Sequence, residues 1–508
     1  MTLRQVLSNL RWTRRGAVVR ASETLNLSRL LGVFCVAALG ACAATGVADF
    51  PFDEVGDVDA TTPEEPDEES TDELRGGADE EDQGDDENIP PGGEGDVQDN
   101  DAGDGDDQDE GEEPTDDEPP PGHPEESDPE DDEDSDDGLP GLAPPDWYEP
   151  QPPIVPSAYD VWSFHPVDGM RCANGQQSGF FSNFSATSDD VLIFFLGGGI
   201  CYDEVSCLTD LNMVLNGLGP DPLAWWMSHG ERHGGIFNRA NPENPFKGAS
   251  YIVLPHCTVD FHVGHKSSSY LTTGPIEQYG YRNVQLAMNH IVPTFAANPD
   301  RSITVAGFSA GGVGAMGNYH QIARAFEWHG HLPPFLINDG GPVQRRPFFS
   351  VNSHNAIRHG WNLPETIEAW CTTCAEHGYH EVLAEIHRLH PGARTSQICS
   401  YSDTVVMALY TLFDAIGNAP HFVEFIPHFP FTFTSMRQGL RDLAAWGDEL
   451  VNAGGGMHRS LLYYGERHGA LTAGQITSGP NGDTPWIHEF LIAQLNRSDP
   501  FWHSSIAP

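Results

Sequence analysis

The sequence predicts an α/β protein with a largely parallel sheet flanked by helices, preceded by a long acidic segment. From about residue 146 onward, short β-prone runs alternate with longer helix-compatible segments, which is the order expected of a parallel sheet covered by helices. Residues 51–140 instead hold about 42 Asp and Glu against the single base Arg75, and such a segment cannot bury a core. We therefore divide the 508-residue chain into residues 1–41, 42–145 and 146–508.

Residues 1–41 have the composition of an export signal. Six arginines precede an apolar run over residues 30–39, which is too short to span a bilayer as a mature helix. The run leads into Leu39-Gly40-Ala41-Cys42, which resembles a bacterial lipobox. We expect Cys42 to be the lipidated first residue of an exported lipoprotein, anchored to a membrane at the cell surface or in the periplasm. An ordinary signal peptide cleaved nearby is the alternative.

Residues 42–145 are predicted to be a disordered tether. Asp, Glu, Gly and Pro dominate it, and mutual repulsion of its charges should keep it extended. It accounts for most of the formal net charge of −51, since residues 151–508 hold about 30 acids and 18 bases. Calcium binding over residues 101–109 is an alternative, but the spacing is not that of an EF-hand. No basic patch with interleaved aromatics is present, so nucleic acid is not an expected partner.

The body, residues 146–508, is predicted to be one large domain. Its candidate strands are Val191 to Leu196, Ser250 to Pro255, Ser302 to Gly307, Phe335 to Ile337 and Ser460 to Tyr464. Its candidate helices are Ile276 to Phe295, Ala310 to Phe326, Glu381 to Leu389, Asp403 to Ile416, Phe433 to Val451 and Trp486 to Leu495.

The body holds seven of the nine cysteines, and export would oxidise most of them. We expect up to three disulfides and one remaining thiol, with a pairing that the sequence does not define. Cys371-Thr372-Thr373-Cys374 could also indicate zinc or redox chemistry, but no second Cys pair at zinc spacing accompanies it.

Ser309 is the predicted nucleophile. It lies in Gly307-Phe308-Ser309-Ala310-Gly311, directly after a β-prone run and before a helix-compatible segment. Strand, sharp turn and helix in this order are typical of the nucleophile elbow of α/β-hydrolases, although a glycine-rich chain also produces such a motif as a simple turn. The N–H groups of Gly198, Gly199 and Ala310 are the expected oxyanion donors, with a plain tight turn as the alternative for the glycines.

Three motifs together resemble the pectin acetylesterase and Notum family of carboxylesterases. They are Gly197-Gly198-Gly199 with Cys201-x5-Cys207, then Leu254-Pro255-His256-Cys257-Thr258-Val259-Asp260, then Gly307-Phe308-Ser309-Ala310-Gly311-Gly312. The similarity runs in order through most of residues 160–490. It implies an α/β-hydrolase-type fold and a Ser, Asp and His triad that works without a metal.

Two aspartates compete for the role of triad acid. Asp339 ends a candidate strand, where composition alone would place a catalytic carboxylate. Asp403 follows Tyr401-Ser402 and resembles the Tyr-Asp motif that carries the acid in the family; we favour it, although it could be only a helix N-cap. Val405 and Val406 replace the aromatic residue and Gln that usually follow in the family.

His468 is the predicted general base, because it lies in a loop after the last candidate strand, late in the order Ser, acid, His. The alternatives are His458, His428 and His488. His256, Asp260 and His262 are expected to border the pocket; a metal bound by them is a weaker alternative, since a serine elbow needs none.

These residues predict a metal-independent serine carboxylesterase without a cofactor, acting on an acylated polysaccharide or another ester. The resemblance favours deacetylation of an extracellular, pectin-like polysaccharide. A deacylase for longer acyl chains would need a deep apolar pocket, lined by residues such as Trp225, Trp226 and Phe261. A surface binding module without catalytic activity is the third alternative.

Overall fold

The computed structural model describes residues 143–229, 234–417, 433–453, 456–472, 487–499 and 502–507, all within one compact unit. The predicted signal, Cys42, almost all of the predicted tether and His428 lie outside these residues. No helix within the described ranges has both the length and the apolar character of a membrane span.

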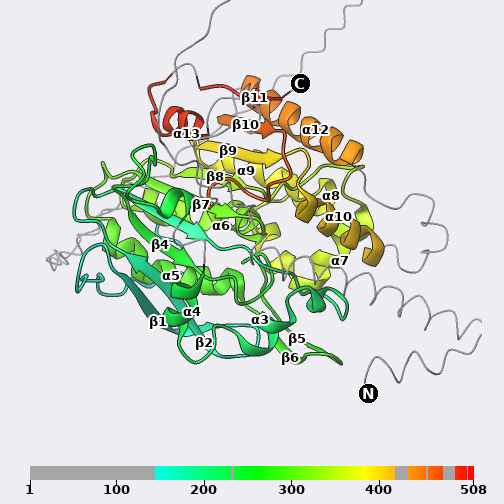
Figure 1. The fold of residues 1–508 in the computed structure, drawn as a ribbon, viewed down its shortest axis with the longest axis horizontal. Coiled ribbons are helices and arrows are strands. Elements are labelled where there is room, and N and C mark those ends of the chain that lie inside the picture. The colour runs from blue at the N-terminus through cyan, green and yellow to red at the C-terminus, as the bar shows by residue number, and fades with distance from the viewer. Residues whose placement is uncertain are drawn as a thin grey trace, which may run out of the picture. The chain divides into compact units, whose positions relative to one another are not determined.

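A nine-stranded sheet forms the centre of the described body (Figure 1). Its strand order is β1-β2-β4-β3-β7-β8-β9-β10-β11; β1 and β2 are antiparallel, and the strands from β4 onward are parallel. The strands are β1 (Trp162–Arg171), β2 (Gln177–Asn183), β3 (Val191–Phe195), β4 (Ser250–Leu254), β7 (Ile303–Phe308), β8 (Phe335–Asp339), β9 (Arg394–Ser400), β10 (Met457–Tyr463) and β11 (Ser505–Ile506). The predicted fold class, a largely parallel sheet flanked by helices as in α/β-hydrolases, is confirmed.

Helices pack on both faces of the sheet. The main ones are α3 (Leu211–Asn216), α4 (Pro222–Ser228), α5 (Gly280–Phe295), α6 (Ala310–Trp328), α7 (Val351–Trp361), α9 (Val382–Leu389), α10 (Thr404–Gly417), α12 (Phe433–Asn452) and α13 (Ile487–Leu495). All six predicted helices are present. One boundary was wrong: residues 276–278 belong to the hairpin of β5 (Lys266–Tyr270) and β6 (Gly274–Gln278), so α5 begins only at Gly280.

The central strand β3 shows how the two faces are buried. Successive side chains of a strand point to opposite faces. Ile193 and Phe195 join the core that includes α5, α6 and α12, while Leu192 and Phe194 join the core that includes α4 and α13. All five residues of β3 are buried, which explains why its sequence is a continuous apolar run.

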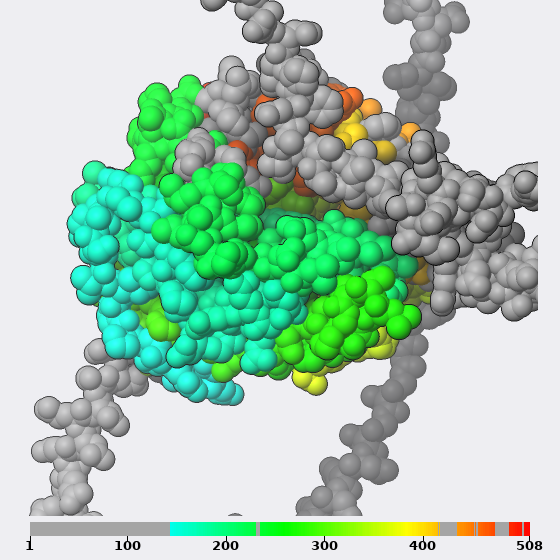
Figure 2. Space-filling view, turned by 60° about the horizontal axis from the view of Figure 1, so that its bottom comes forward, coloured from blue at the N-terminus to red at the C-terminus, as the bar shows by residue number. Residues whose placement is uncertain are grey.

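Three disulfides link the body: Cys172–Cys257, Cys201–Cys207 and Cys371–Cys374. Cys399 is a buried free thiol. The expectation of three disulfides and one remaining thiol is therefore confirmed, and Cys371 and Cys374 pair with each other. Figure 2 shows one face of the molecule, where the described surface comes mostly from the first half of the body, coloured cyan to green.

Candidate active site

Ser309 occupies the sharp turn between β7 and α6. Its backbone has φ 56° and ψ −124°, a conformation that costs a residue with a side chain on the order of 1–3 kcal/mol. The turn is tight enough to exclude side chains on either side. A Cβ at Gly307 would lie 2.0 Å from the carbonyl oxygen of Gly311, and one at Gly311 would lie 2.0 Å from that of Phe195. The strand, strained turn and helix expected of a nucleophile elbow are therefore all present.

His468 and Asp403 form a hydrogen-bonded pair. The His468 Nδ1 lies 2.8 Å from Asp403 Oδ2, and Asp403 is fully buried. Because an ionised carboxylate only accepts hydrogen bonds, the pair places the proton of a neutral His468 on Nδ1 and leaves Nε2 as an acceptor. A general base needs that tautomer.

The second oxygen of Asp403 caps α10. Its Oδ1 accepts the N–H groups of Val405 and Val406 at 3.1 and 3.0 Å. The helix-cap and histidine-partner interpretations of Asp403 are thus both true, since each uses a different oxygen atom.

Asp339 has a different set of partners. Its Oδ2 accepts the N–H groups of Ala470 and Leu471, both at 2.7 Å, and its backbone carbonyl accepts the N–H of Ser309 at 2.7 Å. Burial raises the pKa of Asp339 to about 6. Asp339 therefore links the loop that carries His468 to the nucleophile turn. Of the two candidate aspartates, it is Asp403 that hydrogen-bonds to the imidazole of His468.

The glycine loop after β3 lies against the nucleophile turn, as the oxyanion prediction requires. A Cβ at Gly197 would be 2.8 Å from the Phe308 carbonyl oxygen and 3.0 Å from Ser309 Cβ. Ala310 is the first residue of α6, where backbone N–H groups lack intrahelical acceptors. The N–H of Gly199, however, donates to Asp210 Oδ2 at 3.4 Å. Of the three predicted donors, Gly199 thus has its N–H directed to a protein carboxylate.

The turn over residues 256–262 hydrogen-bonds to Leu196, the residue directly before this glycine loop. His262 Nε2 donates to the Leu196 carbonyl at 2.9 Å, and His256 Nε2 accepts the N–H of Phe261 at 2.9 Å. Asp260 accepts the Thr258 hydroxyl and the N–H groups of His262 and Gly280.

The polar atoms of this turn are therefore largely used within the protein. Burial lowers the pKa of His262 to about 4, so its ring is neutral at physiological pH. Across the described ranges, no group of three or more His, Cys, Asp or Glu residues is arranged to hold a metal ion.

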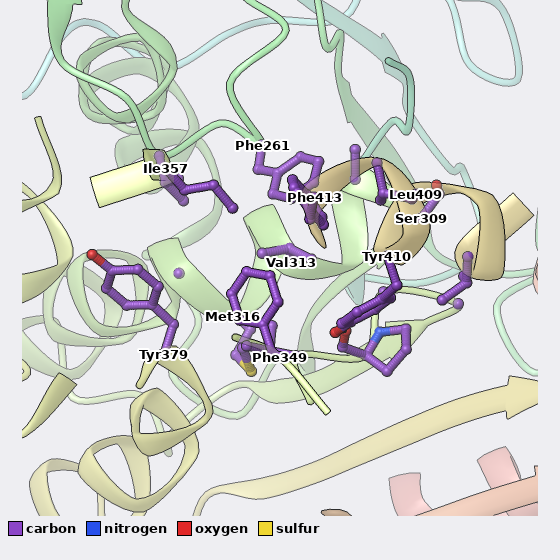
Figure 3. Close-up of a pocket in the computed structure, with 18 of the residues that line it drawn as sticks. Phe261, Ser309, Val313, Met316, Phe349, Ile357, Tyr379, Leu409, Tyr410 and Phe413 are labelled. Atoms are coloured by element: carbon purple, nitrogen blue, oxygen red, sulfur yellow. The ribbon is translucent and has the colours of Figure 1, made fainter. Parts of the chain in front are cut away.

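A deep apolar cavity opens beside Ser309 (Figure 3). It encloses about 760 Å³ of space between protein atoms, including open solvent at its mouth. Ser309 and His468 both line it, and most of its other lining residues are aliphatic or aromatic, among them Phe261, Val313, Met316, Phe349, Ile357, Trp361, Val405, Val406, Leu409 and Phe413. Figure 3 shows Phe261, Val313, Met316 and Phe349 around this space.

The aromatic residues named from the sequence divide between two places. Phe261 lines the cavity as expected, but Trp225 and Trp226 stack on Phe181 at the opposite face of the sheet. Sequence reasoning missed Met316, Phe349 and Phe413. Their only sequence signal is apolar character on a helix or loop, which ordinary core residues share.

Residues 157–333 match the family model described as Pectinacetylesterase. The resemblance to the pectin acetylesterase and Notum family is thereby supported. A curated relative, the palmitoleoyl-protein carboxylesterase notum2 of Xenopus laevis, is 26% identical over 164 residues, or 31% of each protein. The matched segment thus spans about a third of that relative.

Two solved structures of the Wnt deacylase Notum from Drosophila are also similar. The match to crystal form I has 19% sequence identity and a TM-score of 0.45, and it covers 65% of this chain and 91% of the Notum chain. The match to crystal form II has 18% sequence identity and a TM-score of 0.42, and it covers 60% of this chain and 86% of the Notum chain.

Proposed function

We propose that the chain is a serine carboxylesterase in which Ser309, His468 and Asp403 act as a triad. The observation that carries this proposal is the Asp403–His468 hydrogen bond at the cavity lined by Ser309. The matched family and the curated relative are both described as carboxylic ester hydrolases, which supports the same reaction class.

The mechanism follows from the atoms that the site presents. His468 Nε2 takes the Ser309 proton as Oγ attacks the ester carbonyl, while Asp403 holds the imidazole and stabilises its cation. The N–H groups of Gly198 and Ala310 stabilise the oxyanion. The alcohol leaves with the proton from His468, and a water activated by the same base then hydrolyses the acyl-enzyme.

The cavity supports an apolar acyl group longer than acetyl as the preferred substrate part. Burial of each methylene contributes about 0.8 kcal/mol, or about fourfold in specificity, and an acetyl group would leave most of the lining without a partner. Deacetylation of an extracellular polysaccharide is the second candidate, supported by the description of the matched family. A purely binding role would leave the hydrogen bond between the buried Asp403 and His468 unexplained.

We also propose that the enzyme is exported and anchored through lipidation of Cys42. The apolar run that ends at Leu39-Gly40-Ala41-Cys42 supports this. Mass spectrometry of the membrane fraction should find a diacylglyceryl group on Cys42, and Cys42→Ser should release the protein from the membrane. Membrane retention of Cys42→Ser would refute lipid anchoring.

Hydrolysis of p-nitrophenyl acetate, octanoate and palmitate by the full chain tests the proposed reaction and its acyl preference. We expect kcat/KM to rise at least tenfold from acetate to octanoate and to vanish in Ser309→Ala. A preference for acetate would support the deacetylase instead. Failure to hydrolyse any ester would support the binding module.

A further inference from the structure

A second cavity lies next to the one that contains Ser309. It encloses about 360 Å³ between β8, β9, α6, α9 and α12, including space open to solvent. Met316 and Val343 line both cavities, whereas Leu383 and Leu443 line only the second. The side chains of Met316 and Val343 thus lie between the two spaces.

The Met316 side chain, which lies between the two cavities, could open a path between them by changing its rotamer. It lies seven residues beyond Ser309 on α6, which places it on the order of 10 Å along the helix from the nucleophile. Figure 3 shows its side chain beside Phe349 and Val313, away from Ser309. Methionine has an unbranched, flexible side chain, so it can change rotamer with little cost where a branched residue could not.

The polar residues around the second cavity are bonded to protein groups. The Thr395 hydroxyl lies 3.0 Å from both His387 Nε2 and His458 Nδ1. Ser396 Oγ donates to Gln494 Oε1 at 2.8 Å, and Gln397 Nε2 donates to the Asn338 carbonyl at 3.1 Å. Hydrocarbon could therefore enter this space without breaking these hydrogen bonds, and Leu336, Leu383 and Leu443 provide apolar contacts.

We propose that the second cavity receives the distal methylenes of a long acyl chain. Met316 and Val343, which lie between the two cavities, then determine how long a chain must be before it enters the second one. The inference rests on the proposed esterase function and names the substrate determinant of the same site. Met316 lines both cavities, so a chain that passes from the first cavity into the second must displace its side chain.

The test compares p-nitrophenyl octanoate and palmitate in full-chain variants. Met316→Ala should raise the palmitate to octanoate ratio of kcat/KM at least tenfold, because several additional methylenes become buried at about fourfold each. Met316→Leu keeps the bulk but is branched and moves less easily, so its ratio should not rise above that of the natural chain. Met288→Ala removes a fully buried methionine that lines neither cavity, and it should leave the ratio unchanged.

A double variant distinguishes the second cavity from simple enlargement of the first. Leu383→Phe fills only the second cavity, so Met316→Ala/Leu383→Phe should lose the gain for palmitate. Retention of the gain in the double variant would overturn the proposal, as would an unchanged ratio in Met316→Ala that still hydrolyses octanoate. If Met316→Ala does not fold, Val343→Ala is judged by the same criterion.

A binding measurement separates this inference from the esterase proposal. Calorimetric titration of palmitate and octanoate into Ser309→Ala, with and without Met316→Ala, needs no catalysis. We expect Met316→Ala to tighten palmitate binding at least tenfold relative to octanoate. This gain without ester hydrolysis would reject only the esterase, and its absence would reject the second cavity as an acyl site.

Discussion

Replacing Asp403 with Asn should abolish most of the catalytic rate while leaving the fold intact. Asp403 uses Oδ1 to cap α10 and Oδ2 to hold His468 Nδ1. Asn is as good an N-cap as Asp, so its carbonyl oxygen should keep the helix cap and point its NH₂ at the imidazole. His468 Nδ1 must then become the acceptor, which moves the proton to Nε2, where the histidine can no longer accept the Ser309 proton.

The expected loss in kcat is about 10³- to 10⁴-fold, or about 4–5.5 kcal/mol of transition-state stabilisation. The assay is the steady-state rate of p-nitrophenyl octanoate hydrolysis, with urea unfolding to show that stability changes by less than about 1 kcal/mol. A residual rate above a tenth of the natural chain would refute Asp403 as the triad acid.

Asp339→Asn is the matched control, because this carboxylate is equally buried and belongs to the same region. Burial raises the pKa of Asp339 to about 6 even though the N–H groups of Ala470 and Leu471 stabilise its charge, so the ionised carboxylate costs on the order of 3 kcal/mol of stability at neutral pH. Asn keeps an oxygen that can accept from both N–H groups and removes this charge. Asp339→Asn should therefore remain folded and keep at least a tenth of the rate.

Other predictions concern the elbow and the pH dependence of stability. Gly311→Ala should destabilise the protein by at least 3 kcal/mol in urea unfolding, because the new Cβ would collide with the Phe195 carbonyl. The control is Gly248→Ala, whose Cβ would meet only ordinary contacts and should change stability by less than 1 kcal/mol. Equal effects of the two substitutions would contradict the close packing of the turn. Burial lowers the pKa of His458 to about 3 from an ordinary value of 6.5, so the unfolded chain binds more protons and stability is lost as pH falls below 6.5. His458→Gln should therefore reduce the stability loss between pH 7 and pH 5 by about 2 kcal/mol, and an unchanged loss would show that His458 is not the group responsible. Asp339 has the opposite effect on the pH dependence of stability. Because its pKa is raised to about 6 in the folded protein, the free energy of unfolding decreases as pH rises from about 4 to 6. Asp339→Asn should remove this decrease.

The elbow could be predicted because its signals are local. The β-prone run, the small residues around Ser309 and the following helix are adjacent in the chain, and the five predicted strands are all rich in apolar residues. β9 was missed because Arg-Thr-Ser-Gln-Ile-Cys-Ser is mostly polar, yet every residue of it is buried. Its side chains are satisfied by distant partners such as Gln494 and Asn338, which no local pattern indicates.

The site was predictable only in part for the same reason. Sequence order placed His468 after the last predicted strand, but the choice between Asp403 and Asp339 depended on contacts across more than 60 residues. Two further features also depend on the folded arrangement and could not be predicted from local sequence. One is the hydrogen bond from the Gly199 N–H to Asp210. The other is the position of Trp225 and Trp226 on the opposite face of the sheet. The apolar residues of the cavity have the same composition as core residues, so the cavity itself had no signature.

The most direct test of the central claim is labelling of the full chain with a fluorophosphonate, followed by mass-spectrometric location of the adduct. We expect one phosphonyl group per protein, on Ser309, with labelling lost in Ser309→Ala and slowed at least a hundredfold in Asp403→Asn. A folded protein that does not react, or that carries the adduct on another serine, would contradict the assignment of Ser309 as the nucleophile.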